Sequence, residues 1–189
     1  TWDDAPHLDE KEKALLIASY LPYELEARTK GIPSLGAGAV YPISEEDIIV
    51  KPFSIPLDWP KVYGFDPGWE CTAALWAAID PNTGTIYRYD EYYRGTAEPE
   101  IHAAAIRARG KWMTGAADYA GKRDDGRKTL EYYRSLELNV VNADKSVEAG
   151  ILACWQALSS GKVKVFSHLA HFLEEFRIYR KDITYTIKE

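Results

Sequence analysis

Two aspartates stand at the ends of predicted strands, where a sheet can present carboxylates to a ligand. Asp66 closes the apolar run VYGFD and is followed by Pro67-Gly68, a pair typical of a tight turn. Asp118 closes the run GAAD, which is flanked by small residues. Because neighbouring strand ends converge in a mixed sheet, we expect the two carboxylates to lie close together. Two such carboxylates repel each other unless a cation lies between them, and oxygen ligands favour Mg²⁺ or Mn²⁺.

Each aspartate also has a structural interpretation that the residues alone leave open. Asp66 could simply start the turn at Pro67-Gly68, because Asp is favoured at that position. Asp118 could cap the loop that follows its strand. Neither motif is specific by itself, so the metal site is a hypothesis that depends on the fold.

Four further acids are weaker candidates for the same site. Glu70 follows Asp66 closely and could approach a metal through water, and Glu175 lies on the last predicted helix, where a solvated helix face also explains it. Asp90 and Glu91 are adjacent on a predicted strand. Since side chains alternate along a strand, only one of that pair can face the site.

Basic residues crowd the segment after Asp118, in a chain whose formal net charge is −6. Glycines in and before this segment let backbone N–H groups face an anion, so the segment could contact phosphate. Its charges could equally balance Asp124 and Asp125 in a solvated loop. The candidate phosphate-contacting residues are Lys122, Arg123, Arg127 and Lys128, with Lys145 at a later helix start.

The composition is that of a globular protein, with 46% hydrophobic and 28% charged residues among 189. The net negative charge excludes a uniform basic coating for nucleic acid. No run of about 18 apolar residues predicts a membrane span, and no Walker A motif predicts ATP hydrolysis. The start, Thr1-Trp2, has neither a signal peptide nor an initiator Met, so we expect a piece excised from a longer protein.

The cysteines and histidines carry no recognisable ligand spacing. Cys71 and Cys154 lie far apart, and we expect both to be reduced and buried. His102, His168 and His171 fall on predicted helices without a metal-binding pattern, so we expect them to be surface or core fillers.

Alternation and turn signals predict the elements that must position these residues. Residues 1–36 indicate a helical connector, followed by a loop that leads into a strand at residues 39–41. From residue 61 three alternating runs predict an antiparallel meander, and helices and short strands then alternate, which predicts parallel βα units. We therefore expect an α/β fold, a mixed sheet with helices on both faces. One clear helix, after Ser146, has a predicted buried face of Ile151, Leu152, Trp155 and Leu158.

Five motifs in this order carry a resemblance to a known family: GIPSLGAGAVYP, VYGFDPGWECTAAL, AADYAGKRDDG, KSVEAGI and GKVKVF. Together they resemble the C-terminal nuclease domain of the large terminase subunit of tailed bacteriophages, of the headful-packaging, short-tailed type. The resemblance covers residue 30 to the end. It implies an RNase H-like fold for residues 37–189, with residues 1–36 as the connector from an ATPase domain.

The resemblance also implies metal-dependent endonuclease cleavage of double-stranded viral DNA during headful packaging. The family's first acid falls on Asp66 and its second on Asp118. Its third lies on a C-terminal helix whose motif has no match before Glu189, and Asp182 is the only late aspartate that could take its place. The implied cofactors are two divalent cations, Mg²⁺ or Mn²⁺, with Asp66 bridging both and Asp118 binding one.

The implied partners are double-stranded DNA, the portal protein and the small terminase subunit, in the host cytoplasm, with no membrane. We expect the isolated domain to be a monomer. Two alternatives stay open: a non-enzymatic module that docks on the portal, and an RNase H-like resolvase that prefers branched DNA. An actin-like sugar or acid kinase would need phosphate loops and about twice this length, and the sequence shows neither.

Overall fold

The computed structural model describes residues 13, 39–117, 123–144 and 146–180, and the side chains of residues 123–127 lie outside that description. The chain divides into two compact units, residues 1–42 with 176–189 and residues 43–175. The pocket described below is lined by residues of the second unit. The connector predicted for residues 1–36 lies almost entirely outside the described residues, so its boundary with a nuclease domain at residues 37–189 stays a prediction.

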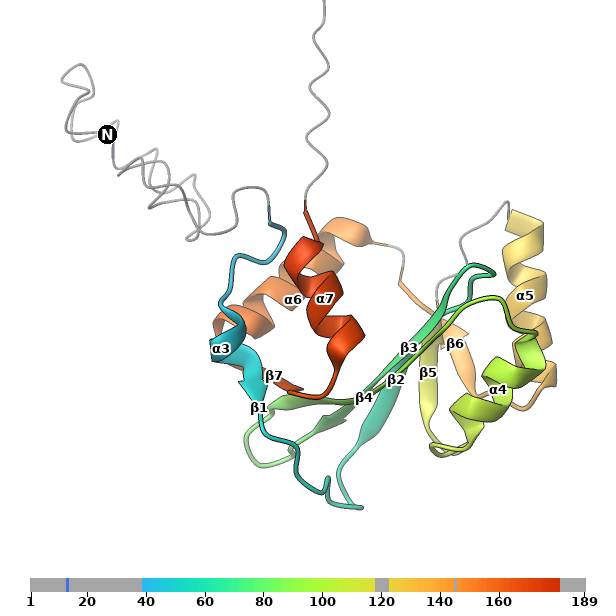
Figure 1. Cartoon of the computed structure of the whole chain (residues 1–189), viewed down its shortest axis with the longest axis horizontal. Helices are drawn as coiled ribbons and strands as arrows, with labels where there is room; N and C mark the ends of the chain where they lie inside the picture. The colour runs from blue at the N-terminus through green and yellow to red at the C-terminus, as the bar shows by residue number, and fades with distance from the viewer. Residues whose placement is uncertain (1–12, 14–38, 118–122, 145, 181–189) are drawn as a thin grey trace, which may run out of the picture. The chain divides into compact units, whose positions relative to one another are not determined.

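The described residues form one seven-stranded mixed sheet in the order β1-β7-β4-β3-β2-β5-β6 (Figure 1). The central strands β2, β3 and β4 are antiparallel, whereas β5 and β6 extend the sheet in parallel on one side and β7 and β1 on the other. The predicted meander and the parallel units that follow it are confirmed. The strands are β1 (Ile49–Val50), β2 (Lys61–Asp66), β3 (Thr72–Ile79), β4 (Ile86–Arg94), β5 (Thr114–Ala117), β6 (Val140–Asn142) and β7 (Val163–Phe166).

Helices flank the sheet. They are α3 (Glu45–Ile48), α4 (Pro99–Arg107), α5 (Arg123–Ser135), α6 (Val147–Ser159) and α7 (Ala170–Ile178). Figure 1 shows α4 and α5 beside the β5–β6 end of the sheet, and α6 beside the β7 end. Within the described residues, no helix has the length and apolar character that crossing a membrane requires.

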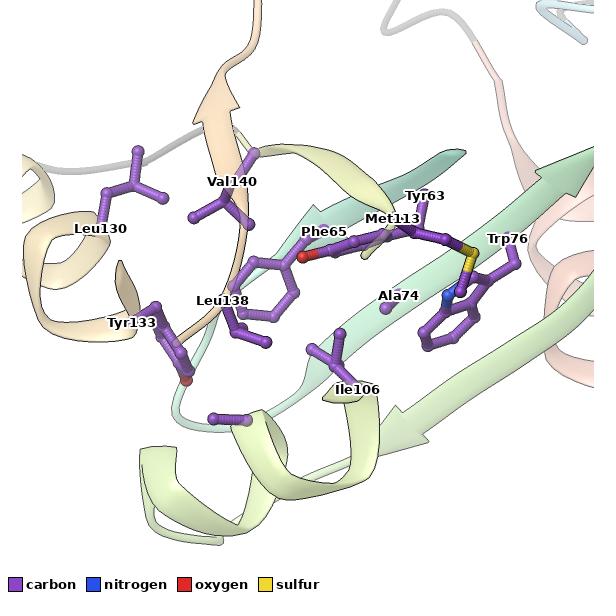
Figure 2. Close-up of a cluster of buried hydrophobic side chains, with 12 residues drawn as sticks. Tyr63, Phe65, Ala74, Trp76, Ile106, Met113, Leu130, Tyr133, Leu138 and Val140 are labelled. Atoms are coloured by element: carbon purple, nitrogen blue, oxygen red, sulfur yellow. The ribbon is translucent and has the colours of Figure 1, made fainter. Parts of the chain in front are cut away.

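The main hydrophobic core lies between one sheet face and helices α4 and α5 (Figure 2). Tyr63 and Phe65 of β2 point into it: Tyr63 stacks on Trp76, which is fully buried, and Phe65 meets Tyr133 of α5 edge to face. Residues that alternate with these two on β2, Val62, Gly64 and Asp66, are exposed. Because successive side chains on a strand point to opposite faces, core packing through Phe65 directs Asp66 away from the core.

The strand expected at residues 39–41 is not formed. Ala39 makes only an isolated bridge to Arg180. The edge strand is instead β1, Ile49–Val50, which pairs in parallel with β7. With only two residues, β1 is too short to show an alternating pattern in the sequence.

Two burial predictions are wrong. On α6 only Leu158 is buried, and Leu152 is 47% exposed, because the helix packs mainly on β7, a single short strand. Cys71 and Cys154 are free, but Cys71 is half-buried and Cys154 is exposed on that same helix.

Candidate active site

Asp66 ends the central strand β2, as the sequence predicts, and its side chain is exposed. Its register partner on β3 is Ala73, whose small side chain leaves space above the sheet beside the carboxylate. In β4, Tyr93 lies opposite Ala73, so the three residues form one row across the sheet. Asp66 therefore opens onto the sheet face that lies opposite the main core.

A pocket of about 290 Å³ lies over this face of the sheet. Three carboxylates line it, each from a different element: Asp66 of β2, Glu91 of β4 and Glu175 of α7. Tyr93 and His171 line it as well. Glu175 was a weak candidate on sequence, and the structure places it in the same pocket as Asp66.

Glu91 uses its carboxylate to hold the start of α7. Its two oxygens accept hydrogen bonds from the backbone N–H groups of His171, at 3.0 Å, and Phe172, at 2.9 Å. The first N–H groups of a helix have no partner within the helix and carry its positive dipole end, so a carboxylate from β4 suits them. Glu91 thereby couples the strand to the helix that carries Glu175.

Asp90 lies on the opposite sheet face, as strand alternation predicts for one member of the Asp90–Glu91 pair. Its carboxylate accepts a 2.6 Å hydrogen bond from the Nε of Arg109, whose guanidinium lies over the Trp76 ring. Asp90 is thus part of the packing on the core side and does not face the pocket.

Tyr93 and His171 form a stacked pair in the pocket wall. Their ring centroids are 4.3 Å apart and the rings are nearly parallel, at 11°. A hydrogen bond with the Cys71 thiol raises the pKa of Tyr93, and the charge on Glu175 adds to the effect. Tyr93 is therefore a neutral hydroxyl at physiological pH.

The histidines were predicted to be surface or core fillers: His102 is buried in the core, and His171 is an exposed residue that also lines the pocket. The sequence feature that could have placed His171 beside Glu175 is the spacing of four residues between them. Residues four apart on a helix share a face, so His171 and Glu175 project together from α7.

The structure describes only some of the other site residues that the sequence predicts. Strand β5 runs parallel to β2 and pairs Ala117 with Phe65, the residues that directly precede Asp118 and Asp66. Lys128 is exposed on α5, and Arg123 and Arg127 belong to the same helix. Glu70 is exposed in the loop after β2 and does not line the pocket. Four predicted residues lie outside the described part: Asp118, Lys122, Lys145 and Asp182.

The pocket offers carboxylate oxygens, which are the type of ligand that hard divalent cations such as Mg²⁺ prefer. Asp66 and Glu175 are both exposed there, whereas Glu91 is already engaged by the helix. Among the described residues, no group of three or more His, Cys, Asp or Glu side chains is close enough to hold a metal ion. The described carboxylates by themselves therefore form no metal site.

Comparison by sequence relates the chain to large terminase subunits. No family model matches it. It is 29% identical over 193 residues to the large terminase subunits of Enterobacteria phage LP7 and Salmonella phage P22, and these matches cover 95% of the chain. They cover 40% and 38% of the two relatives, so the chain spans about two fifths of the length of the curated relatives it matches.

Comparison by structure relates the fold to solved terminase nuclease domains. The P22 large terminase nuclease domain matches with a TM-score of 0.68 at 24% identity, over 78% of this chain and 81% of that one. The nuclease of phage G20c, solved with bound magnesium, matches at 0.56 and 19% identity, over 76% and 82%. The nuclease domain of phage SPP1, solved with bound Mn, matches at 0.55 and 15%, over 72% and 80%.

Both comparisons confirm the resemblance to the nuclease domain of the large terminase subunit that the motifs predict. The predicted fold class is confirmed too: the chain has an RNase H-like mixed sheet flanked by helices.

Proposed function

We propose that the chain is the nuclease domain of a phage large terminase subunit and cuts double-stranded DNA during headful genome packaging. The observation that carries the proposal is Asp66, an exposed carboxylate at the end of the central strand, directed into a pocket that two further carboxylates line. The relatives of the chain are large terminase subunits, and the similar structures are nuclease domains.

The cofactors we propose are two divalent cations, Mg²⁺ or Mn²⁺, since the similar nuclease domains of G20c and SPP1 were solved with Mg and Mn. Asp66 and Asp118 would hold them, and Asp182 is the late aspartate proposed as a third ligand. When bound, such ions neutralise the scissile phosphate and lower the pKa of an attacking water. The contribution of the chain is to fix its carboxylates: Asp66 by core packing of the neighbouring Phe65, and Glu175 by the bonds of Glu91 to α7.

DNA would approach from the end of β5, where the chain continues into α5. Arg123, Arg127 and Lys128 lie in the first half of that helix, and Lys128 is exposed. Together with Lys122 and Lys145 they would contact phosphates without reading sequence, because phosphate contacts position a duplex and do not specify it. A local cluster of cations is needed, since the chain as a whole carries a net charge of −6.

The remaining proposals concern the setting of the reaction. As part of a packaging motor, the domain would work in the host cytoplasm with the portal protein and the small terminase subunit. We propose that the isolated domain is a monomer.

Cleavage of a supercoiled plasmid, with and without Mn²⁺, tests the proposal. We expect metal-dependent nicking and linearisation by the wild type. Asp66→Asn should cut at least about a hundredfold more slowly, because even an outer partner of a metal ligand is worth about 10- to 100-fold. Asp58→Asn is the matched control, because Asp58 is an exposed acid in the loop before β2, at the opposite end of the strand.

Each alternative has its own outcome. Wild-type rates for Asp66→Asn would overturn the site assignment. No cleavage by the wild type, with binding to portal protein retained, would favour the docking module. A strong preference for four-way junctions over linear duplex would favour the resolvase.

A further inference from the structure

We infer that Trp69 stacks on an unpaired base of the DNA strand next to the Asp66 pocket, which makes it a substrate-positioning residue. This inference rests on the proposed function. Trp69 follows Asp66 by three residues, so its Cα lies within about 11 Å of the Cα of Asp66. Its side chain is 64% exposed, whereas tryptophan is on average among the most buried residues.

The loop that carries Trp69 is held rigidly at its base. Thr72 is fully buried, and its hydroxyl donates a 2.8 Å hydrogen bond to the carbonyl of Gly68 and accepts one from the Gly68 N–H. On the other side, the N–H of Thr96 donates a 2.9 Å hydrogen bond to the carbonyl of Trp69 itself. Backbone on both sides of the indole is thus fixed while the ring is left in solvent.

Close backbone approach adds to this rigidity. A Cβ at Gly95 would lie 2.2 Å from the carbonyl oxygen of Glu70, so the loop after β4 packs directly on the loop after β2. A preorganised aromatic ring loses little conformational entropy when a ligand stacks on it. The loops after β2 and β4 therefore hold each other in place, and the exposed Trp69 ring lies on the first of them, three residues after Asp66.

The exposed indole indicates the chemistry of the ligand, because aromatic side chains bind single-stranded nucleic acid by stacking on its bases. A base inside an intact duplex has both faces covered by its neighbours, so Trp69 requires an unpaired or frayed base.

The chain offers a matched control in Trp112. It is 63% exposed, nearly the same as Trp69, but it precedes β5, where Thr114 pairs with Val62 near the start of β2. Trp112 therefore lies at the end of β2 opposite to Asp66. Its ring faces the Nζ of Lys61 at 5.9 Å.

The test measures binding of the 189-residue chain to a duplex with a 3′ single-stranded overhang that carries 2-aminopurine, with EDTA present to prevent cleavage. Stacking on an indole quenches 2-aminopurine fluorescence. We expect quenching by the wild type and by Trp112→Ala, and a loss of quenching with roughly 5- to 150-fold weaker binding for Trp69→Ala. Trp69→Phe should retain most of the affinity, because it keeps an aromatic face.

The outcomes separate this inference from the function on which it rests. Equal affinity and quenching for wild type and Trp69→Ala would overturn the role of Trp69 and leave the nuclease proposal intact. An equal loss for Trp69→Ala and Trp112→Ala would also overturn it, since the position next to Asp66 would then not matter. Absence of DNA binding by the wild type would overturn both.

Discussion

Neighbouring acids on one strand have different roles here because the strand separates them onto two faces. Asp90 is neutralised by Arg109 on the core side, while Glu91 faces the pocket and accepts two N–H groups of α7. Glu91 could have served as an open metal ligand, but its oxygens already have donors. At the residue scale, its role is to position α7, and with it Glu175 and His171.

Replacing Glu91 by glutamine tests that positioning role. The amide keeps one acceptor oxygen but loses the charge and one of the two bonds, so we expect a loss of about 1 kcal/mol in the free energy of unfolding. Amide hydrogen exchange at His171 and Phe172 should accelerate, as measured by mass spectrometry or NMR. Asp90→Asn, which removes an acid from the other face, should leave exchange at those two amides unchanged, and acceleration in both variants would contradict the role.

At the element scale, helix α4 and strand β4 meet through a buried histidine. The Nδ1 of His102 lies 2.8 Å from the hydroxyl of Tyr92, and the rings meet edge to face. Burial is the main cause that lowers the pKa of His102; a hydrogen bond with the Ala97 backbone opposes it, and the positive charge of Arg94 adds a smaller lowering. The folded chain therefore keeps this histidine neutral at a pH where the unfolded chain protonates it.

The lowered pKa of His102 predicts that the free energy of unfolding depends on pH. As pH falls from 7.5 through the unfolded value of about 6.5, the unfolded state binds a proton that the folded state does not, so the free energy of unfolding falls. Urea denaturation at pH 7.5 and 5.5 measures the loss, in a window above the titration of most carboxylates. His102→Asn should be less stable at pH 7.5 but should lose less stability on acidification, and an unchanged pH slope would contradict the assignment.

Elements with a strong local pattern could be predicted from the sequence. The β2–β3–β4 meander and Asp66 at the end of β2 follow from alternation and from the turn at Pro67-Gly68. Burial along α6 could not be predicted, because it depends on how much sheet the helix meets. The pocket could not be predicted either, since Glu91 and His171 are 80 residues apart and only the packing of α7 on β4 brings them together.

At the scale of the whole molecule, the excess of acidic residues should lower the stability of the fold at the pocket that contains Asp66. The chain carries a net charge of −6, and Asp66, Glu91 and Glu175 line a single pocket. Like charges in one pocket repel each other, and a cation bound there only in the folded state converts this repulsion into attraction. Divalent metal should therefore stabilise the fold through the same residues that the proposed cleavage uses.

Thermal unfolding with increasing Mn²⁺ measures this linkage. At a metal concentration roughly one hundred times Kd, binding to the folded state alone contributes about 2.7 kcal/mol, which for a chain of this size raises Tm by about 5–10 °C. Asp66→Asn should show little or no increase, while its metal-free Tm should equal or exceed that of the wild type, because one repelling charge is gone. Asp58→Asn should behave as the wild type does. An equal rise in Tm for the wild type and Asp66→Asn would place the stabilising ion elsewhere in the molecule, and it would do so without any assay of cleavage.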